Sequence, residues 1–297
     1  MKIRSAFTMI ELIFVIVVMG IIAKFGVEFL ARAYESFIFS STNNALQAKS
    51  ASAVEFIANR LQYRIKDSVI VRTTQAANLT PLADAVSGTQ YLVLEWISAD
   101  IDGFRGTNTP LWSGIIDLDV GVDIGGSAYL HSPATNTATA NALIKRLSHD
   151  SGTTINNAAL YFIGSNSDIN GFGWDAAITD QTGFMHPITT DANFPTRFYP
   201  KVGAFVGTQV HEYYQLAWTA NAIVVTLGAN NRHRLTFHTD YQPWEGEGFA
   251  NASIQSLLME DASTFQAMAI GSIIKIQVCA KSNLVEEYSL CKEKTVY

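Results

Sequence analysis

The N-terminal apolar run is the feature that most limits what this chain can fold into. After a short leader with two cations, Lys2 and Arg4, the run extends from Phe7 to Ala23 and contains one charged residue, Glu11. An apolar run at a chain terminus rarely finds enough protein core to cover it, which disfavours a buried helix. Its length is at the short end of the roughly 17–25 residues that cross a bilayer as a helix. The sequence therefore predicts a membrane-spanning segment over residues 7–23.

Two further interpretations of this run are a cleaved signal peptide and an ordinary signal anchor, and Glu11 bears on the second of them. A cleaved secretory signal peptide ends at a small-residue cleavage site, but here the chain continues as A-K-F-G-V-E-F-L. An ordinary signal anchor, held by positive charge inside, leaves the carboxylate unexplained. An ionised and unpaired carboxylate costs about 2.5–3.5 kcal/mol or more at bilayer depth. Because Glu11 is this costly to insert unpaired, we expect its carboxylate to have a partner.

The segment A-F-T-M-I-E-L, which runs from Ala6 to Leu12 behind the basic leader, carries a resemblance. It resembles the prepilin-type cleavage and methylation motif of type IV pilins and type II secretion pseudopilins. The resemblance implies that prepilin peptidase cuts between Ala6 and Phe7, removes the leader 1–6 and methylates the new amine of Phe7. It also implies that Glu11 neutralises the amine of a neighbouring subunit during assembly. A desolvated pair of this kind is sensitive to register, so it would dictate where each subunit docks.

Two positions depart from the family pattern. Ala6 stands where the family usually has glycine, and cleavage is still expected because both side chains are small. Glu28 stands where many members have a proline, so the helix lacks a built-in kink there. The second departure argues against a major, fibre-forming subunit. The large head and the arginine-bearing helix end, IANRLQYRIKDSVI, most resemble those of J-type or W-type minor subunits.

The resemblance implies a structural function and no enzymatic activity. The chain would be a minor pilin or pseudopilin, assembled into or at the tip of a type IV pilus or a type II secretion pseudopilus. Its partners would be other pilins or pseudopilins, prepilin peptidase and the inner-membrane assembly platform. It would cross the bacterial inner membrane once, with its head in the periplasm or, on assembly, outside the cell. A large head suggests a tip or initiation role, because bulk hinders dense helical packing.

Composition excludes several other classes of protein. The 297 residues include 20 Lys and Arg against 26 Asp and Glu, a net charge of −6. Removal of Lys2 and Arg4 would leave 18 against 26, or −8. This acidic balance argues against direct nucleic-acid binding. The 48% hydrophobic content excludes disorder of the whole chain.

A long helix over residues 7–66 is predicted from the absence of proline and the spacing of apolar residues. The predicted buried stripe follows steps of three or four residues and comprises Ala48, Ala51, Val54, Ala58, Leu61 and Ile65. Residues 40–44 (SSTNN) are weak helix formers, so two helices divided there are the alternative. The first half would span the membrane and the second half would lie against the head.

The head, residues 67–297, is predicted to be an antiparallel sheet, which makes the chain α+β with a pilin-like layout. Short turns between consecutive strands favour antiparallel pairing, with turns expected at residues 228–231 and at Gly271. A short helix is expected within 141–149, and residues 131–141 and 164–195 are expected to be long loops. The strand candidates are 69–72, 91–97, 115–120, 158–163, 202–206, 213–219, 222–227, 234–239, 263–269, 272–280, 285–291 and 293–297.

The two cysteines, Cys279 and Cys291, lie on adjacent strand candidates. Two cysteines are too few for a disulfide scaffold. A head outside the cytoplasmic membrane is in a compartment where disulfides persist, so a bridge is predicted, with two free buried thiols as the alternative. The resemblance agrees, because many type IV pilins close a C-terminal loop with a disulfide.

An acidic turn gives the one cofactor candidate, a calcium ion. The segment N-x-D-x-N-G places Asn166, Asp168 and Asn170 at alternate positions, with Asp175 further on. Alternating oxygen ligands followed by glycine resemble a calcium loop, but Ala177 stands where the bidentate glutamate belongs. A solvated turn stabilised by Asn and Asp side chains is the preferred interpretation, and calcium is the alternative. The acidic turn at 100–103 is interpreted in the same way.

No catalytic motif is found in the sequence. His211, His233 and His238 are interpreted as core or surface residues, because no nucleophile, phosphate-binding or zinc-protease motif accompanies them. Two alternatives to a pilin-like subunit stay open. One is a signal-anchored envelope receptor or adhesin that binds a ligand through its long loops, and the other is an anchored hydrolase.

Overall fold

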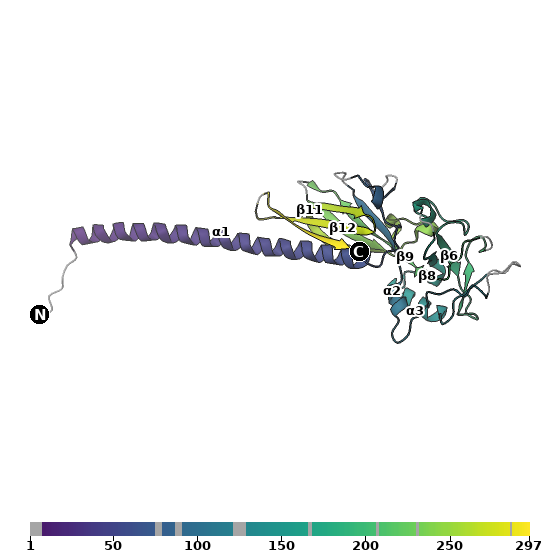
Figure 1. Cartoon of the computed structure of the whole chain (residues 1–297). Helices are drawn as coiled ribbons and strands as arrows, with labels where there is room; N and C mark the ends of the chain where they lie inside the picture. The colour runs from purple at the N-terminus through teal and green to yellow at the C-terminus, as the bar shows by residue number, and fades with distance from the viewer. Residues whose placement is uncertain are drawn as a thin grey trace.

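A computed structural model describes residues 8–74, 79–86, 91–120, 129–165, 168–205, 208–229, 232–285 and 287–297. One long helix, α1 (Met9–Leu61), carries all the other elements near its C-terminal end and projects far beyond them (Figure 1). Among the described residues, the two further α-helices are α2 (Ile101–Arg105) and α3 (Thr137–Leu147). The chain is therefore α+β with an N-terminal helix, as predicted.

The strands form two sheets, and every pairing within them is antiparallel. The eight-stranded sheet has the order β13-β12-β11-β10-β9-β3-β1-β2, and the five-stranded sheet has the order β4-β7-β6-β5-β8. The strands are β1 (Ile70–Arg72), β2 (Thr80–Pro81), β3 (Val93–Ser98), β4 (Leu130–His131), β5 (Ala159–Phe162), β6 (Met185–Thr189), β7 (Arg197–Pro200), β8 (Tyr214–Ala217), β9 (Thr219–Thr226), β10 (His233–Thr239), β11 (Ile254–Ile270), β12 (Ile273–Lys281) and β13 (Ser289–Val296).

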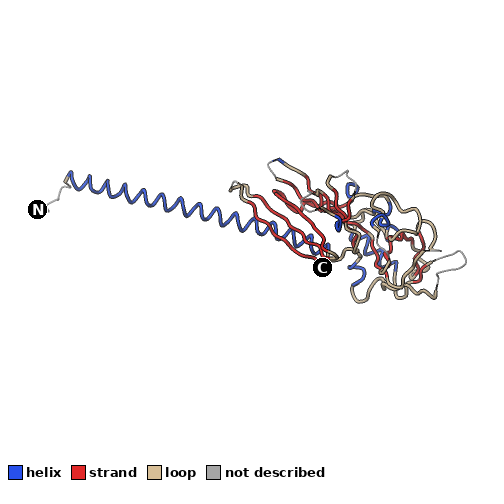
Figure 2. The backbone as a smooth tube through the Cα atoms, turned by 45° about the horizontal axis from the view of Figure 1, so that its top comes forward, coloured by secondary structure: helices blue, strands red, loops and turns tan. Residues whose placement is uncertain are grey.

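Helix α1 is continuous through the polar run at residues 40–44, so the two-helix alternative is wrong. Only its second half packs on the head, mainly against β13 and β12 (Figure 2). There Leu46, Val54, Ile57 and Leu61 are buried against one face of the eight-stranded sheet. Packing of this apolar stripe keeps the weak helix formers of the 40–44 segment helical, because tertiary contacts override propensity.

The predicted stripe on α1 is correct in its C-terminal part and wrong in its first part. Val54, Ala58, Leu61 and Ile65 are buried, whereas Ala48 is exposed. The row that faces the sheet passes instead through Ser50, whose hydroxyl donates to the Leu46 carbonyl at 2.6 Å. A serine whose hydroxyl bonds to the preceding turn of the helix can be buried. The predicted stripe counted only apolar residues, so it passed over Ser50.

The helix ends five residues earlier than residue 66, because the backbone changes partner. Ile65 donates its N–H to the Ile97 carbonyl at 2.8 Å, and Ala99 donates to the Tyr63 carbonyl at 2.9 Å. The buried Arg64 guanidinium donates to the Leu61 carbonyl at 2.9 Å and to the Ser272 carbonyl at 2.6 Å. Arg64 therefore ties the end of α1 to the turn between β11 and β12.

The predicted turn at Gly271 is confirmed. Gly271 has φ +61° and, with Ser272, joins Ile270 to its register partner Ile273. The strands on either side of the 228–231 turn, β9 and β10, also pair as expected. The last two strand candidates, 285–291 and 293–297, are one strand, β13.

The sequence indicated only two strands of the five-stranded sheet, β5 and β8, which lie within the candidates 158–163 and 213–219. Strands β6 and β7 lie in or just beyond the segment 164–195, which was expected to be a loop. The candidates 115–120 and 202–206 are wrong as strands. Over 115–120 the backbone forms only isolated bridges, and the described residues 202–205 form no strand. The predicted helix exists as α3, which begins at Thr137 inside the other expected loop.

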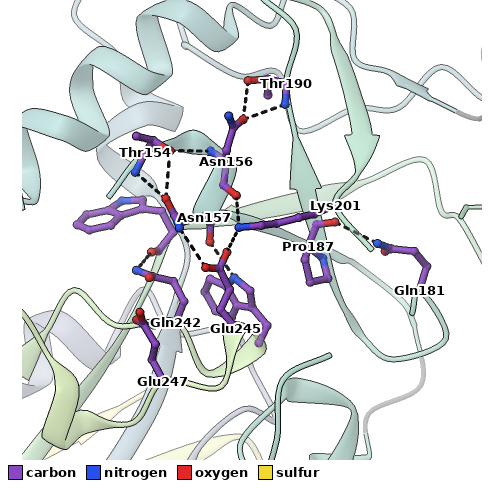
Figure 3. Close-up of polar contacts among 12 residues, drawn as sticks. Thr154, Asn156, Asn157, Gln181, Pro187, Thr190, Lys201, Gln242, Glu245 and Glu247 are labelled. Carbon is purple, nitrogen blue, oxygen red and sulfur yellow. Dashed lines mark hydrogen bonds and ion pairs between the residues drawn. The ribbon is translucent and has the colours of Figure 1, made fainter. Parts of the chain in front are cut away.

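A polar network fastens the two sheets to each other (Figure 3). Glu245, on the short 3-10 helix after β10, forms an ion pair with Lys201, which follows β7. Its other carboxylate oxygen accepts from Asn157 Nδ2 at 3.0 Å, and the Asn157 carbonyl accepts from Trp244 Nε1 at 2.8 Å. Three contacts between segments of different sheets fix their relative position.

Candidate assembly segment and disulfide of the head

The N-terminal half of α1 exposes nearly all of its apolar side chains. From Met9 to Ile22 every large apolar side chain is exposed except Val18, which is partly buried, and Phe14 is 70% exposed. Among the described residues, α1 is the one helix long and apolar enough to cross a membrane. Water disfavours so large an apolar surface, so lipid or other protein must cover it.

Glu11 forms a capping box with Thr8 at the start of this helix. The Thr8 backbone N–H and hydroxyl donate to Glu11 Oε2 at 3.1 and 3.0 Å, and the Glu11 N–H donates to Thr8 Oγ1 at 3.4 Å. The two bonds that Thr8 donates end on the same carboxylate oxygen, Oε2, and no described residue donates to Oε1. The carboxylate thus has a local partner, which the sequence analysis missed, and keeps one oxygen for a further donor. Ala6 and Phe7 lie outside the described residues.

The disulfide prediction is confirmed. Cys279 on β12 and Cys291 on β13 face each other in register, with an S–S distance of 2.04 Å and a Cα–Cα distance of 3.9 Å. Strand β13 is an edge strand of the sheet and is also the strand that packs most closely with α1. The Lys294 ammonium on β13 forms an ion pair with Glu55 of α1. The bridge therefore holds in place the strand on which the helix rests.

Replacing both cysteines with alanine is expected to lower the free energy of unfolding by about 3 kcal/mol, because the bridge closes a short loop in the unfolded chain. The measurement is urea unfolding of the purified chain in detergent, without reductant. The reduced wild-type protein should match the double variant. Equal stability of the oxidised wild type and the variant would contradict the prediction.

The acidic turns are closed by their own hydrogen bonds. Asp168 Oδ1 accepts from the Asn170 N–H at 3.1 Å and from Asn170 Nδ2 at 2.9 Å, as expected for a turn stabilised by its own side chains, and Asp175 is exposed. Asn166 lies outside the described residues. Within the described ranges, no group of three or more His, Cys, Asp or Glu could hold a metal ion. Calcium binding at this turn stays a prediction.

The turn at 100–103 is buried rather than solvated. Asp100 is 4% exposed and accepts from the Gly103 N–H and from Trp112 Nε1, both at 3.1 Å. Burial raises the pKa of Asp100 to about 6. The carboxylate caps α2 and ties it to Trp112, which explains its place in the fold.

Of the three histidines singled out in the sequence, His233 and His238 have structural partners, whereas Nε2 of His211 is buried without a hydrogen-bond partner among the described residues. His238 contacts the Phe249 carbonyl at 2.9 Å, and His233 Nδ1 accepts from the Gly228 N–H at 3.1 Å. The buried His186, which the sequence analysis missed, lies 3.2 Å from Gln181 Oε1, and burial lowers its pKa to about 4. Since Gln181 Nε2 donates to two carbonyls, its oxygen faces His186, and Nδ1 of the neutral ring is the donor.

A buried carboxylate on β3 was also missed. Glu95 is 1% exposed, and its two oxygens accept from Arg72 Nε at 2.7 Å and from the Tyr241 hydroxyl at 3.0 Å. Its signal in the sequence is a single charge within the apolar strand YLVLEWI. The three side chains come from β1, β3 and the segment after β10, so they tie three parts of the head together.

Comparisons with protein-family models, with curated proteins and with solved structures find no match to this chain.

Proposed function

We propose that this chain is a minor pilin or pseudopilin that is cleaved between Ala6 and Phe7, methylated on Phe7, and assembled through α1. The observation that carries the proposal is the joint layout of α1. Its first half is apolar, exposed and capped by Thr8 and Glu11, and its second half is packed into a folded head. A helix of this form can insert in a membrane and, after withdrawal, bury the same surface against identical or related helices. The fold would then be pilin-like.

The free oxygen of Glu11 supports the proposed role in subunit docking. Thr8 donates only to Oε2, so Oε1 can accept from the terminal amine of a neighbouring subunit. The local bonds from Thr8 lessen the cost of keeping the carboxylate ionised while the chain is still in the membrane. The head would lie in the periplasm or outside the cell, in agreement with the disulfide.

Mass spectrometry of the mature protein, purified from membranes of cells that contain prepilin peptidase, tests the proposal. We expect a chain that begins at Phe7 and carries one methyl group on its terminal amine. The matched control is the same protein from cells without the peptidase, which should retain Met1–Ala6. A mature chain that keeps the leader, or that begins elsewhere without methylation, would contradict the proposal and favour an envelope receptor.

A further inference from the structure

A cleft of about 460 Å³ opens between the C-terminal end of α1, strands β9 to β11 and the start of α2. Small-molecule sites typically have volumes of roughly 300–1,000 Å³ and combine apolar walls with a few placed polar groups. This cleft has both kinds of lining. Its residues come from at least four separate segments of the chain, so it exists only in the folded head.

One wall of the cleft is aromatic and carries a cation. Phe56 of α1 and Phe237 of β10 meet edge to face, with ring centroids 5.0 Å apart. The Arg60 guanidinium carbon lies 5.6 Å from each of these centroids. Arg60 is exposed, and none of the ion pairs found among the described residues includes it. Its planar fork of N–H donors fits a carboxylate in a bidentate manner.

The floor of the cleft holds a buried acceptor without a donor. Asn221 of β9 is 2% exposed and lines the cleft, and its Nδ2 donates to Ser98 Oγ at 2.5 Å. Its Oδ1 has no hydrogen-bond partner, and neither does Nε1 of its register partner Trp96. A buried polar atom of this kind calls for a complementary group. Asn221 Oδ1 is therefore open to a hydroxyl or N–H donor, either from a ligand in the cleft or from the neighbouring Trp96 Nε1.

The remaining polar lining combines hydroxyl groups with two carboxylates, that of Asp100, which already accepts from Gly103 and Trp112, and that of the exposed Asp102. Ser98, Thr219, Thr239 and Ser256 all line the cleft. A hydroxyl can both donate and accept, so this lining matches a ligand that itself carries several hydroxyls. A purely apolar ligand would leave the Asn221 acceptor and the Arg60 charge without partners.

We infer that this cleft binds a carboxylated sugar, with its carboxylate on Arg60, its apolar ring face against Phe56 and a ring hydroxyl donating to Asn221 Oδ1. The site is independent of assembly through α1, because the residues that α1 contributes to it, Phe56 and Arg60, lie at the end of α1 that is packed into the head. It would give a subunit at a filament tip, or a receptor anchored in the envelope, a means of binding acidic glycans.

The test uses the full chain in detergent, titrated with glucuronate and followed by ligand-observed NMR and tryptophan fluorescence. We expect saturable binding of glucuronate and at least about tenfold weaker binding of uncharged glucose, since a charge-assisted hydrogen bond contributes about a factor of ten or more. Arg60→Gln should weaken glucuronate binding by a similar factor. Arg60 is exposed, so the variant should keep its fold, which circular dichroism verifies.

Arg146→Gln is the matched control, because Arg146 is also an exposed arginine in the last turn of a helix and does not line the cleft. It should bind glucuronate like the wild type. Absence of saturable binding, equal affinity for glucose and glucuronate, or equal affinity of the two variants would each overturn the inference. None of these outcomes bears on cleavage or methylation at Phe7, so the two proposals fail separately.

Discussion

Replacing Glu11 with glutamine is expected to stop incorporation of the chain into a filament while its cleavage and membrane insertion continue. Glutamine at the third helical position still accepts from Thr8, so the cap is kept and only the charge is lost. The amine of the neighbouring subunit would then be buried without a counter-charge. Losing one partner of a buried pair costs about 3–5 kcal/mol, which corresponds to at least about a hundredfold less assembly.

The measurement is the amount of this chain in sheared and pelleted filaments, relative to the amount in membranes. Glu11→Val, which removes both the charge and the cap, should show the same loss from filaments with normal membrane insertion. If Glu11→Gln assembles normally and only Glu11→Val fails, the carboxylate acts as a helix cap and not as a docking charge. Assembly of both variants at the wild-type level would exclude both roles.

The features predicted correctly are those that depend on neighbouring residues. The apolar run at 7–23 needs no distant partner to be recognised, and α1 lacks any proline that would end it. The pairing of Cys279 with Cys291 needs only two adjacent strands joined by a short connection. The Gly271 turn is of the same kind, because positive φ favours glycine at that position.

Three strands of the five-stranded sheet, β4, β6 and β7, were missed because they are short and weakly patterned. Strand β6 reads MHPIT and β7 reads RFYP, and each contains a proline that argues against a strand. They are stabilised by distant contacts instead. Ile188 and Phe198, for example, are fully buried in a core that also includes Trp112 and Tyr214. Such packing involves residues far apart in the chain, so a few consecutive residues do not indicate it.

The candidate sites also differ in whether they depend on neighbouring residues or on residues far apart in the chain. Thr8 and Glu11 are three residues apart, and the motif that contains them is local. The lining of the cleft is brought together from residues as distant as Arg60 and Asn221, and nothing in either segment indicated that the two would meet. The Glu95 network was signalled only by a charge inside an apolar strand, and nothing in the sequence indicated that Arg72 and Tyr241 would be its partners.

Replacing Arg72 with methionine is expected to lower the free energy of unfolding by about 3–5 kcal/mol at pH 8, because it leaves the Glu95 carboxylate buried with only the Tyr241 hydroxyl as donor. Methionine keeps much of the arginine stem, so the loss reports mainly on charge. The measurement is urea unfolding in detergent, followed by the fluorescence of the five tryptophans.

The pH dependence of the loss distinguishes a charge effect from a packing effect. Burial raises the pKa of Glu95, and the Arg72 guanidinium opposes this rise, so the pKa should be higher still in the variant. A carboxyl whose pKa is raised on folding contributes stability below its unfolded value, near 4.5, and that stability is lost as the pH rises through the folded value. The unfolding free energy of the variant should therefore be closer to that of the wild type at pH 4.5 than at pH 8.

The double variant Arg72→Met with Glu95→Gln, which has no charge to bury, should recover stability at pH 8 and lose this pH dependence. A loss of equal size at both pH values, unrelieved by Glu95→Gln, would mean that Arg72 stabilises the head through packing of its stem.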